Sequence, residues 1–324
     1  DIVSILATLV GLGVTIGYGV SQFSSGLFNI TGIEWLIDNE GRPSLTGQVF
    51  GLVLIMTISC VSAFTGIRKG IKWLSNINMG LSLLLLLFFV FFGATLFALK
   101  NFLVTIWDYV ISFPEMAISV WKNDGTEVSL NLQKWQSAWS IFYWAWWIAF
   151  APFVGLFLAR VSRGRTIREY IMGAIFIPSL ISLFWFSFVG GTAIDLELSG
   201  VAQGAIVNAD ISAQLFQTIN LFMNPTMAVS LSVLVVILLI TFLVTSADSG
   251  ILVMNTLASG GNTKKRELKH IIIWGLLFSI MIAVLLMAGG MDSLRSVMII
   301  GALPFSLILA LMPVALIKTI LQNR

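Results

Sequence analysis

Three tryptophans and a phenylalanine stand close together in one apolar stretch of the chain. The stretch covers residues 137–159 and contains Trp144, Trp146, Trp147 and Phe150. Tryptophan in a membrane helix normally lies at the lipid–water interface, whereas Trp146 and Trp147 fall near the middle of this stretch. Aromatic faces held away from water attract cations, including quaternary ammonium groups. The run therefore predicts a site for such a cation, and a packed aromatic seam between helices is the alternative.

A proline follows the aromatic run directly, at Pro152. Proline removes one backbone hydrogen bond from a helix and leaves a carbonyl without its partner one turn earlier. Irregular backbone at membrane depth is tolerated where it is buried or lines a cavity, and broken helices mark the binding sites of many transporters. We therefore expect the helix to break at Pro152, beside the cation site.

A second set of oxygen atoms lies nearer the C-terminus. Thr245 and Ser246 are adjacent hydroxyls, the carbonyl of Phe242 lies one turn earlier, and Asp248 follows. Hard cations take oxygen ligands, so Phe242, Thr245 and Ser246 predict part of a sodium site that another helix completes. Hydrogen bonds from the hydroxyls back to their own helix are the alternative. Asp248 is a costly carboxylate in an apolar run, and it either carries a proton or fixes a neighbouring helix.

The composition places these residues in a membrane. Hydrophobic residues make up 58% of the 324 positions, charged residues 10%, and the mean hydropathy is +0.98. Such a chain reads as an all-α polytopic membrane protein. The net charge of +3 follows from membrane topology and does not indicate nucleic-acid binding. A membrane enzyme would need a nucleophile–base pair or a metal cluster, which one histidine, His270, and one cysteine, Cys60, do not supply.

Eight apolar runs are long enough to cross a bilayer core of about 30 Å. They cover residues 3–28, 45–66, 77–99, 137–159, 169–191, 227–256, 270–290 and 296–319. Residues 101–120 mix aromatic and acidic side chains, and they predict an amphipathic helix along the membrane surface; an ordered loop is the alternative. Asp1 leads directly into the first run without a charged leader, which does not fit a signal peptide and predicts an internal fragment of a longer chain.

Most of the basic residues fall in every second loop, as the positive-inside rule requires if both ends of this chain are cytoplasmic. These loops carry Arg68, Lys69, Lys72, Arg160, Arg163, Arg165, Arg168, Lys264, Lys265, Arg266 and Lys269, and the C-terminal end adds Lys318 and Arg324. The alternate loops are expected to hold Arg42, Lys100, Lys122, Lys134 and Arg295.

Several motifs resemble those of the betaine/choline/carnitine transporter family. Residues 144–155 with the basic segment 159–169 resemble its most specific signature, and Leu74–Asn78, Gly190–Ile194 and Thr245–Ser249 match further patterns in the expected order. The resemblance covers essentially the whole chain. It implies a LeuT-type inverted-repeat transporter core, here incomplete and holding spans five to twelve of twelve in one domain. It also implies that residues 101–120 match a helix associated with homotrimer formation.

The resemblance assigns roles to individual residues. Trp144, Trp146 and Trp147 match the tryptophans of the substrate helix, and Phe150 stands where a further tryptophan is frequent. Phe242, through its carbonyl, Thr245 and Ser246 match a widely shared sodium site. Thr8 and Phe153 match a second sodium site, in which Leu12 replaces an expected threonine and puts that site in doubt.

These observations predict a secondary symporter that imports a trimethylammonium compound, such as glycine betaine or choline, by alternating access. The coupling ion is sodium or a proton, with no other cofactor, and the location is the inner membrane of a bacterium, among its lipids. Sodium-independent antiporters of the family carry a basic residue on the span matching residues 3–28, where this chain has none. A non-transporting fragment is the remaining alternative.

Overall fold

A computed structural model describes residues 1–65, 68–261 and 268–322, and helices make up nearly all of it. Within these residues no β-strand occurs, and the extended pairing is a single bridge between Ile37 and Pro43. The elements are α1 (Ile2–Thr31), the 3₁₀ turn η1 (Glu34–Leu36), α2 (Leu45–Thr65), α3 (Arg68–Phe92), α4 (Thr95–Ile118), α5 (Glu127–Gln136), η2 (Ser137–Ile141), α6 (Phe142–Val161), α7 (Ile167–Ile171), η3 (Met172–Phe176), α8 (Ile177–Trp185), η4 (Phe186–Gly190), α9 (Gly191–Leu198), α10 (Gln214–Phe222), α11 (Pro225–Ala258) and α12 (Leu268–Gln322).

Three of the short elements, η2, η3 and η4, are π-helical turns. They join the helices on either side into long rods, from Glu127 to Val161 and from Ile167 to Leu198. The described residues contain eight helical segments long and apolar enough to cross a membrane. The chain is therefore an all-α polytopic membrane protein.

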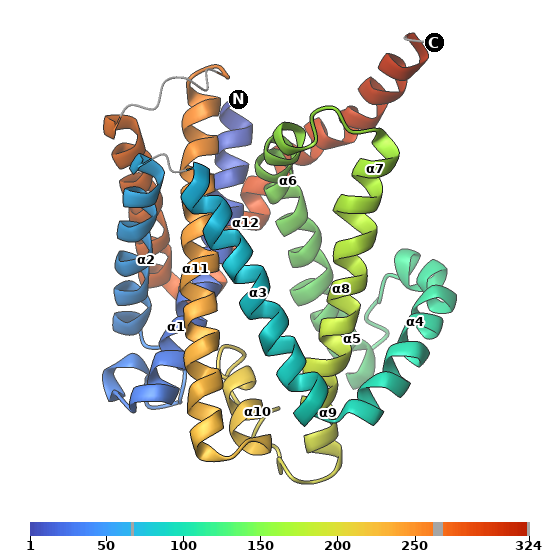
Figure 1. Ribbon diagram of the computed structural model, residues 1–324. Coiled ribbons are helices and arrows are strands. Elements are labelled where there is room, and N and C mark those ends of the chain that lie inside the picture. The colour runs from blue at the N-terminus through green and yellow to red at the C-terminus, as the bar shows by residue number, and fades with distance from the viewer. Residues whose placement is uncertain (66–67, 262–267, 323–324) are drawn as a thin grey trace.

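The centre of the molecule is the antiparallel pair α1 and α11, against which α2, α6 and α12 pack. Figure 1 shows α1, α2 and α11 together on one side, α6 and α8 on the other, and α4 outermost. The two central helices approach closely because, at two positions, a glycine of one helix faces a leucine of the other. A methyl group built on Gly19 of α1 would overlap Leu243 of α11, and one built on Gly250 of α11 would overlap Leu12 of α1.

The expected span over residues 77–99 is wrong in its C-terminal part, because α3 ends at Phe92 and α4 begins at Thr95. Thr192 of α9 stabilises this break: its hydroxyl accepts a hydrogen bond from Ala94 N at 3.2 Å and donates one to Phe188 O at 2.7 Å. Gly93 leaves the space that the hydroxyl occupies. The segment 101–120, expected as a separate amphipathic helix or a loop, is instead the larger part of α4, which is itself long and apolar enough to cross a membrane.

Residues 270–290 and 296–319, expected as two spans, form two helices within α12 that meet at a sharp kink. At the kink Gly289 and Gly290 leave helical geometry, and Gly290 has φ 63°, a conformation that favours glycine. In Figure 1 the halves of α12 before and after the kink run in different directions. Arg295, expected in a loop, therefore lies inside a helix shortly after the kink.

Part of the topology prediction lies outside the described residues: position 66 of the second expected span, three basic residues of one loop, and the last residue of the chain. The three loop residues are Lys264, Lys265 and Arg266, and the last residue is Arg324. Which side of the membrane each end faces stays a prediction.

Candidate functional site

The aromatic run lies on α6, directly after the π-helical turn η2. Pro152 does not break this helix as expected, because α6 continues through it to Val161. The proline is buried, and neighbouring helices support the segment that has lost its hydrogen bond. The aromatic side chains are therefore carried by one continuous helix. A π-helical turn beside them is a feature frequent at functional sites.

Trp146, Trp147 and Phe150 line one cavity of about 260 Å³, together with Tyr143 and Thr15. The Trp146 indole is partly buried, and its Nε1 donates a hydrogen bond to Thr15 Oγ1 of α1 at 3.3 Å. Trp147 is 68% exposed and forms the open side of the cavity. This cavity presents aromatic faces with a single polar anchor, which is the arrangement that binds a soft, poorly hydrated cation.

A layer of two rings, Tyr18 and Phe142, backs this cavity. Tyr18 of α1 stacks on Trp146 with centroids 5.9 Å apart and an interplanar angle of 25°, and Phe142 lies 5.2 Å from Trp146. Sequence reasoning missed Tyr18, Phe142 and Thr15, whereas the helical spacing of Tyr143 places it on the same face as Trp147 and Phe150. Phe142 carried a local signal, since it precedes Trp146 by one helical turn, whereas Tyr18 and Thr15 lie on a distant helix and carried none.

Trp144 does not share the cavity of the other two tryptophans. Its side chain, 73% exposed, lines a larger cavity of about 630 Å³ between α6, the end of α4 and the second half of α12. One helical turn separates Trp144 from Trp147, but the two side chains face different spaces. The structure thus brings together three of the four expected substrate residues and leaves Trp144 apart.

Arg295 occupies the far side of the ring layer. Its guanidinium carbon lies 5.2 Å from the centre of the Tyr18 ring and 5.4 Å from that of Phe142, and its Nε donates a hydrogen bond to the Tyr18 hydroxyl. Arg295 and Tyr18 line a third, polar cavity of about 350 Å³. Asp292 approaches Arg295 at 3.4 Å, but its own side chain is 89% exposed.

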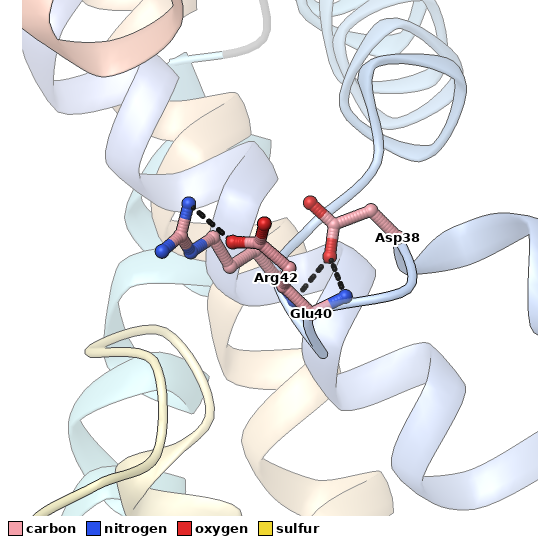
Figure 2. Close-up of polar contacts among 3 residues, drawn as sticks. All are labelled: Asp38, Glu40 and Arg42. Carbon is pink, nitrogen blue, oxygen red and sulfur yellow. Dashed lines mark hydrogen bonds and ion pairs between the residues drawn. The ribbon is translucent and has the colours of Figure 1, made fainter.

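The polar cavity also receives side chains from the loop after α1. Figure 2 shows that Arg42 forms an ion pair with Glu40 at 2.8 Å, while Asp38 Oδ1 accepts hydrogen bonds from the backbone N–H groups of Glu40 and Arg42. The charges of this loop are therefore engaged mainly with one another. Arg295 differs from Arg42 because its guanidinium contacts the aromatic layer.

The predicted sodium residues lie on one stretch of α11. Thr245 Oγ1 donates hydrogen bonds to Thr241 O and Phe242 O, each at 3.0 Å, and Ser246 is partly exposed. The hydroxyl bonds back to its own helix, as the alternative reading expected, and this same contact places the Thr245 oxygen beside the Phe242 carbonyl. The oxygens are close enough to serve one ion if the hydroxyl proton turns away.

The residues of the expected second sodium site lie on α1 and α6. The Thr8 hydroxyl is buried and has no hydrogen-bond partner among the residues that the structure describes. Leu12, which replaces the expected threonine, is fully buried and packs on Gly250 of α11. Phe153 is partly buried beside Phe150, with ring centroids 5.7 Å apart. Thr8 therefore offers an oxygen to this site, while Leu12 offers none.

Asp248 is buried, at 1% exposure, and contacts a neighbouring helix. Ser62 of α2 donates a hydrogen bond to Asp248 Oδ2 at 2.6 Å. This contact supports the role of fixing a helix. Elsewhere in the described part of the chain no three His, Cys, Asp or Glu side chains gather into a metal-binding group.

A model of the betaine/carnitine/choline family of transporters matches residues 1–324. Among curated proteins, the glycine betaine transporter OpuD of Bacillus subtilis is 35% identical over 324 residues, covering 100% of this chain and 60% of its own length. The ectoine/hydroxyectoine transporter of Virgibacillus pantothenticus is 38% identical over 314 residues, covering 96% and 59%.

The glycine betaine/proline/choline transporter VP1723 of Vibrio parahaemolyticus is 34% identical over 323 residues, covering 100% of this chain and 55% of its own. The chain thus spans about half the length of the curated relatives it matches. The family and these named relatives are transporters, not enzymes. The chain belongs to the betaine/carnitine/choline transporter family.

Proposed function

We propose that this chain forms part of a secondary symporter that imports a quaternary ammonium compound by alternating access. The observation that carries the proposal is the cavity of Trp146, Trp147 and Phe150, anchored to α1 by the hydrogen bond between Trp146 and Thr15. A trimethylammonium group desolvated against two or three such rings gains about 2 kcal/mol or more. Two relatives named above carry glycine betaine or choline in their names, which supports the same substrate class.

The coupling ion is sodium or a proton. Sodium is supported by the Thr245 hydroxyl and the Phe242 carbonyl, 3.0 Å apart on α11 with Ser246 next in sequence, and a second ion is supported by the unpartnered Thr8 hydroxyl. Neither set completes the coordination shell of an ion, so further oxygens must come from other helices. A proton is supported by the buried carboxylate of Asp248. Sodium-independent antiport is the alternative within the family.

We further propose a homotrimer in the inner membrane of a bacterium, with both ends of this chain cytoplasmic. The support for the trimer is α4, which stands at the edge of the molecule and exposes the large apolar side chains of Leu103, Trp107 and Val110. These side chains contact lipid in a monomer and a second copy in a trimer. Cross-linking of cysteines placed on α4 distinguishes the two arrangements.

The transport proposal is tested with labelled glycine betaine and choline in proteoliposomes. The product of the complete coding sequence is compared with the 324-residue chain, under a sodium gradient, under a proton gradient, and with no gradient but unlabelled substrate inside. Uptake driven by one ion gradient supports the symporter. Uptake that requires internal substrate supports the antiporter, and uptake of neither compound under any condition contradicts the transport proposal.

The same experiment decides whether the chain works alone. Uptake by the 324-residue chain contradicts the reading of a non-transporting fragment. Uptake by the longer product alone supports that reading. Replacing Thr245 and Ser246 together by alanine in the active protein is expected to raise the sodium concentration needed for half-maximal uptake at least tenfold.

A further inference from the structure

We propose that Arg295 selects zwitterionic substrates, which carry a carboxylate as well as an ammonium group, over substrates that are purely cationic. The inference rests on the proposed function and concerns the same aromatic site. Its basis is the position of a fixed positive charge directly behind the ring layer that backs the tryptophan cavity.

The first step is distance. The Arg295 guanidinium carbon lies 5.2 Å from the Tyr18 ring, and that ring stacks 5.9 Å from Trp146. The guanidinium therefore lies within about 11 Å of the Trp146 ring, as these two distances require. An ammonium group bound against Trp146 is within electrostatic reach of Arg295, because the Tyr18 ring contacts both Trp146 and the guanidinium.

The second step is that this charge stays in place. The guanidinium contacts the faces of both Tyr18 and Phe142 and donates to the Tyr18 hydroxyl, so three contacts hold it. Arginine remains protonated at any physiological pH. Asp292 is the acidic group that pairs with it, and water screens this carboxylate because its side chain is 89% exposed. The positive charge facing the rings is therefore only partly neutralised.

The third step compares substrates. At an effective dielectric constant near 20, two unit charges about 12 Å apart change a binding constant by about tenfold. The ammonium group of a pure cation such as choline is repelled by Arg295, and nothing in the substrate offsets this repulsion. A zwitterion such as glycine betaine also carries a carboxylate, and the attraction of this group to Arg295 offsets part of the repulsion of its ammonium group. The rings of Trp146, Trp147 and Phe150 recognise the ammonium group in both, so Arg295 supplies the discrimination.

The other charged side chains of the polar cavity do not compete for this role. Arg42 is paired with Glu40, and Asp38 accepts two backbone hydrogen bonds in the same loop. Asp210 Oδ1 accepts hydrogen bonds from the backbone N–H and the hydroxyl of Ser212. Arg42 is therefore a matched control: an arginine that lines the same polar cavity and is held by its own loop.

The test measures dissociation constants for glycine betaine and choline on the product of the complete coding sequence, purified in detergent. The variants are Arg295→Gln, Arg295→Lys and the control Arg42→Gln. We expect Arg295→Gln to shift the ratio of the two constants toward choline by about tenfold. Arg295→Lys should keep most of the original ratio, because it keeps the charge, and Arg42→Gln should leave the ratio unchanged.

Three outcomes overturn the inference. If Arg295→Gln weakens both ligands equally, with or without a lower melting temperature, Arg295 has a structural role alone. If the ratio does not move, its charge is not sensed at the site. If Arg42→Gln shifts the ratio as much as Arg295→Gln, the effect belongs to the cavity as a whole. In each case binding by the unmodified protein leaves the proposed function standing, whereas an unmodified protein that binds neither compound overturns both proposals.

Discussion

Leu243 of α11 fills the space above Gly19 of α1, so that no side chain larger than hydrogen fits at position 19. The same two helices repeat this contact in reverse at Leu12 and Gly250. Thr245 and Ser246 lie between Leu243 and Gly250 on α11, and Phe242 directly precedes Leu243, so the two contacts flank the hydroxyls of the predicted sodium site. The fit of α1 against α11 thus positions the oxygens of α11 relative to Thr8 on α1.

Replacing Gly19 by alanine is expected to destabilise the protein by about 1–3 kcal/mol, because the added methyl group overpacks a buried contact. Thermal unfolding in detergent measures the effect. Gly80→Ala is the control, since Gly80 lies within α3 and nothing approaches its added methyl group. That change should be neutral or slightly stabilising. Equal effects of the two substitutions would contradict the close α1–α11 contact.

Replacing Trp147 by leucine is expected to weaken binding of a trimethylammonium substrate by about thirtyfold, which corresponds to a cation–π contribution of about 2 kcal/mol. The melting temperature should hardly change, because the side chain is largely exposed. Trp144→Leu is the matched control on the same helix, as it lines the other cavity. The measurement is the dissociation constant of the substrate for each variant. An equal loss of affinity in both variants would place Trp144 in the substrate site.

Replacing Ser62 by alanine is expected to cost about 1–3 kcal/mol of stability, because a buried carboxylate loses a hydrogen-bond donor. The measurement is unfolding in detergent, with Ser279→Ala as control, since the Ser279 hydroxyl donates to Gly275 O one turn back in its own helix. The control should change stability by a few tenths of a kcal/mol. A Ser62→Ala variant as stable as the unmodified protein would show that Asp248 does not depend on α2.

The loop between α4 and α5 should keep its structure well into the acid range. Hydrogen bonds from the Ser129 and Thr126 side chains, and from Thr126 N–H, lower the pKa of Asp124 from 3.8 to about 2. Since the folded-state pKa lies below the unfolded one, the carboxylate contributes its full stabilisation above about pH 4 and loses it as the pH falls through about 2. A carboxyl NMR titration should show a midpoint near 2, and Ser129→Ala should raise it. A midpoint near 3.8 in the unmodified protein would contradict these hydrogen bonds.

Sequence alone gave the class of protein and most of the helices, because long apolar runs have few alternatives to a membrane helix. It misplaced the ends of those helices whose boundaries depend on a tertiary contact. The break at Gly93 depends on Thr192, which lies 99 positions later in the chain. Pro152 was expected to end a helix, yet α6 continues through it, because surrounding helices tolerate the missing hydrogen bond.

The candidate site was predicted only in part, because some of its residues are brought together by tertiary contacts. Trp146 and Phe150 lie one turn apart on one helix, so helical spacing was enough to group them. Tyr18 and Arg295 reach the same rings from α1 and α12, and no local pattern in the sequence connects them. Arg295 interrupts an apolar run and was assigned to a loop, but the glycine kink at Gly289 and Gly290 starts a new helical segment that contains it.

The π-helical turn over Ser137–Ile141 changes the rotation of the following helix, α6, about its axis. A residue added to a helix rotates everything after it by about 100° relative to an unbroken α-helix. This rotation sets the direction in which Trp146 and Phe150 of α6 point toward α1, and no residue of the turn lines the cavity of Trp146, Trp147 and Phe150. The number of residues in the turn thus determines the direction in which the cavity faces. Removing one residue from the turn would rotate the aromatic side chains away from α1 without changing any of them.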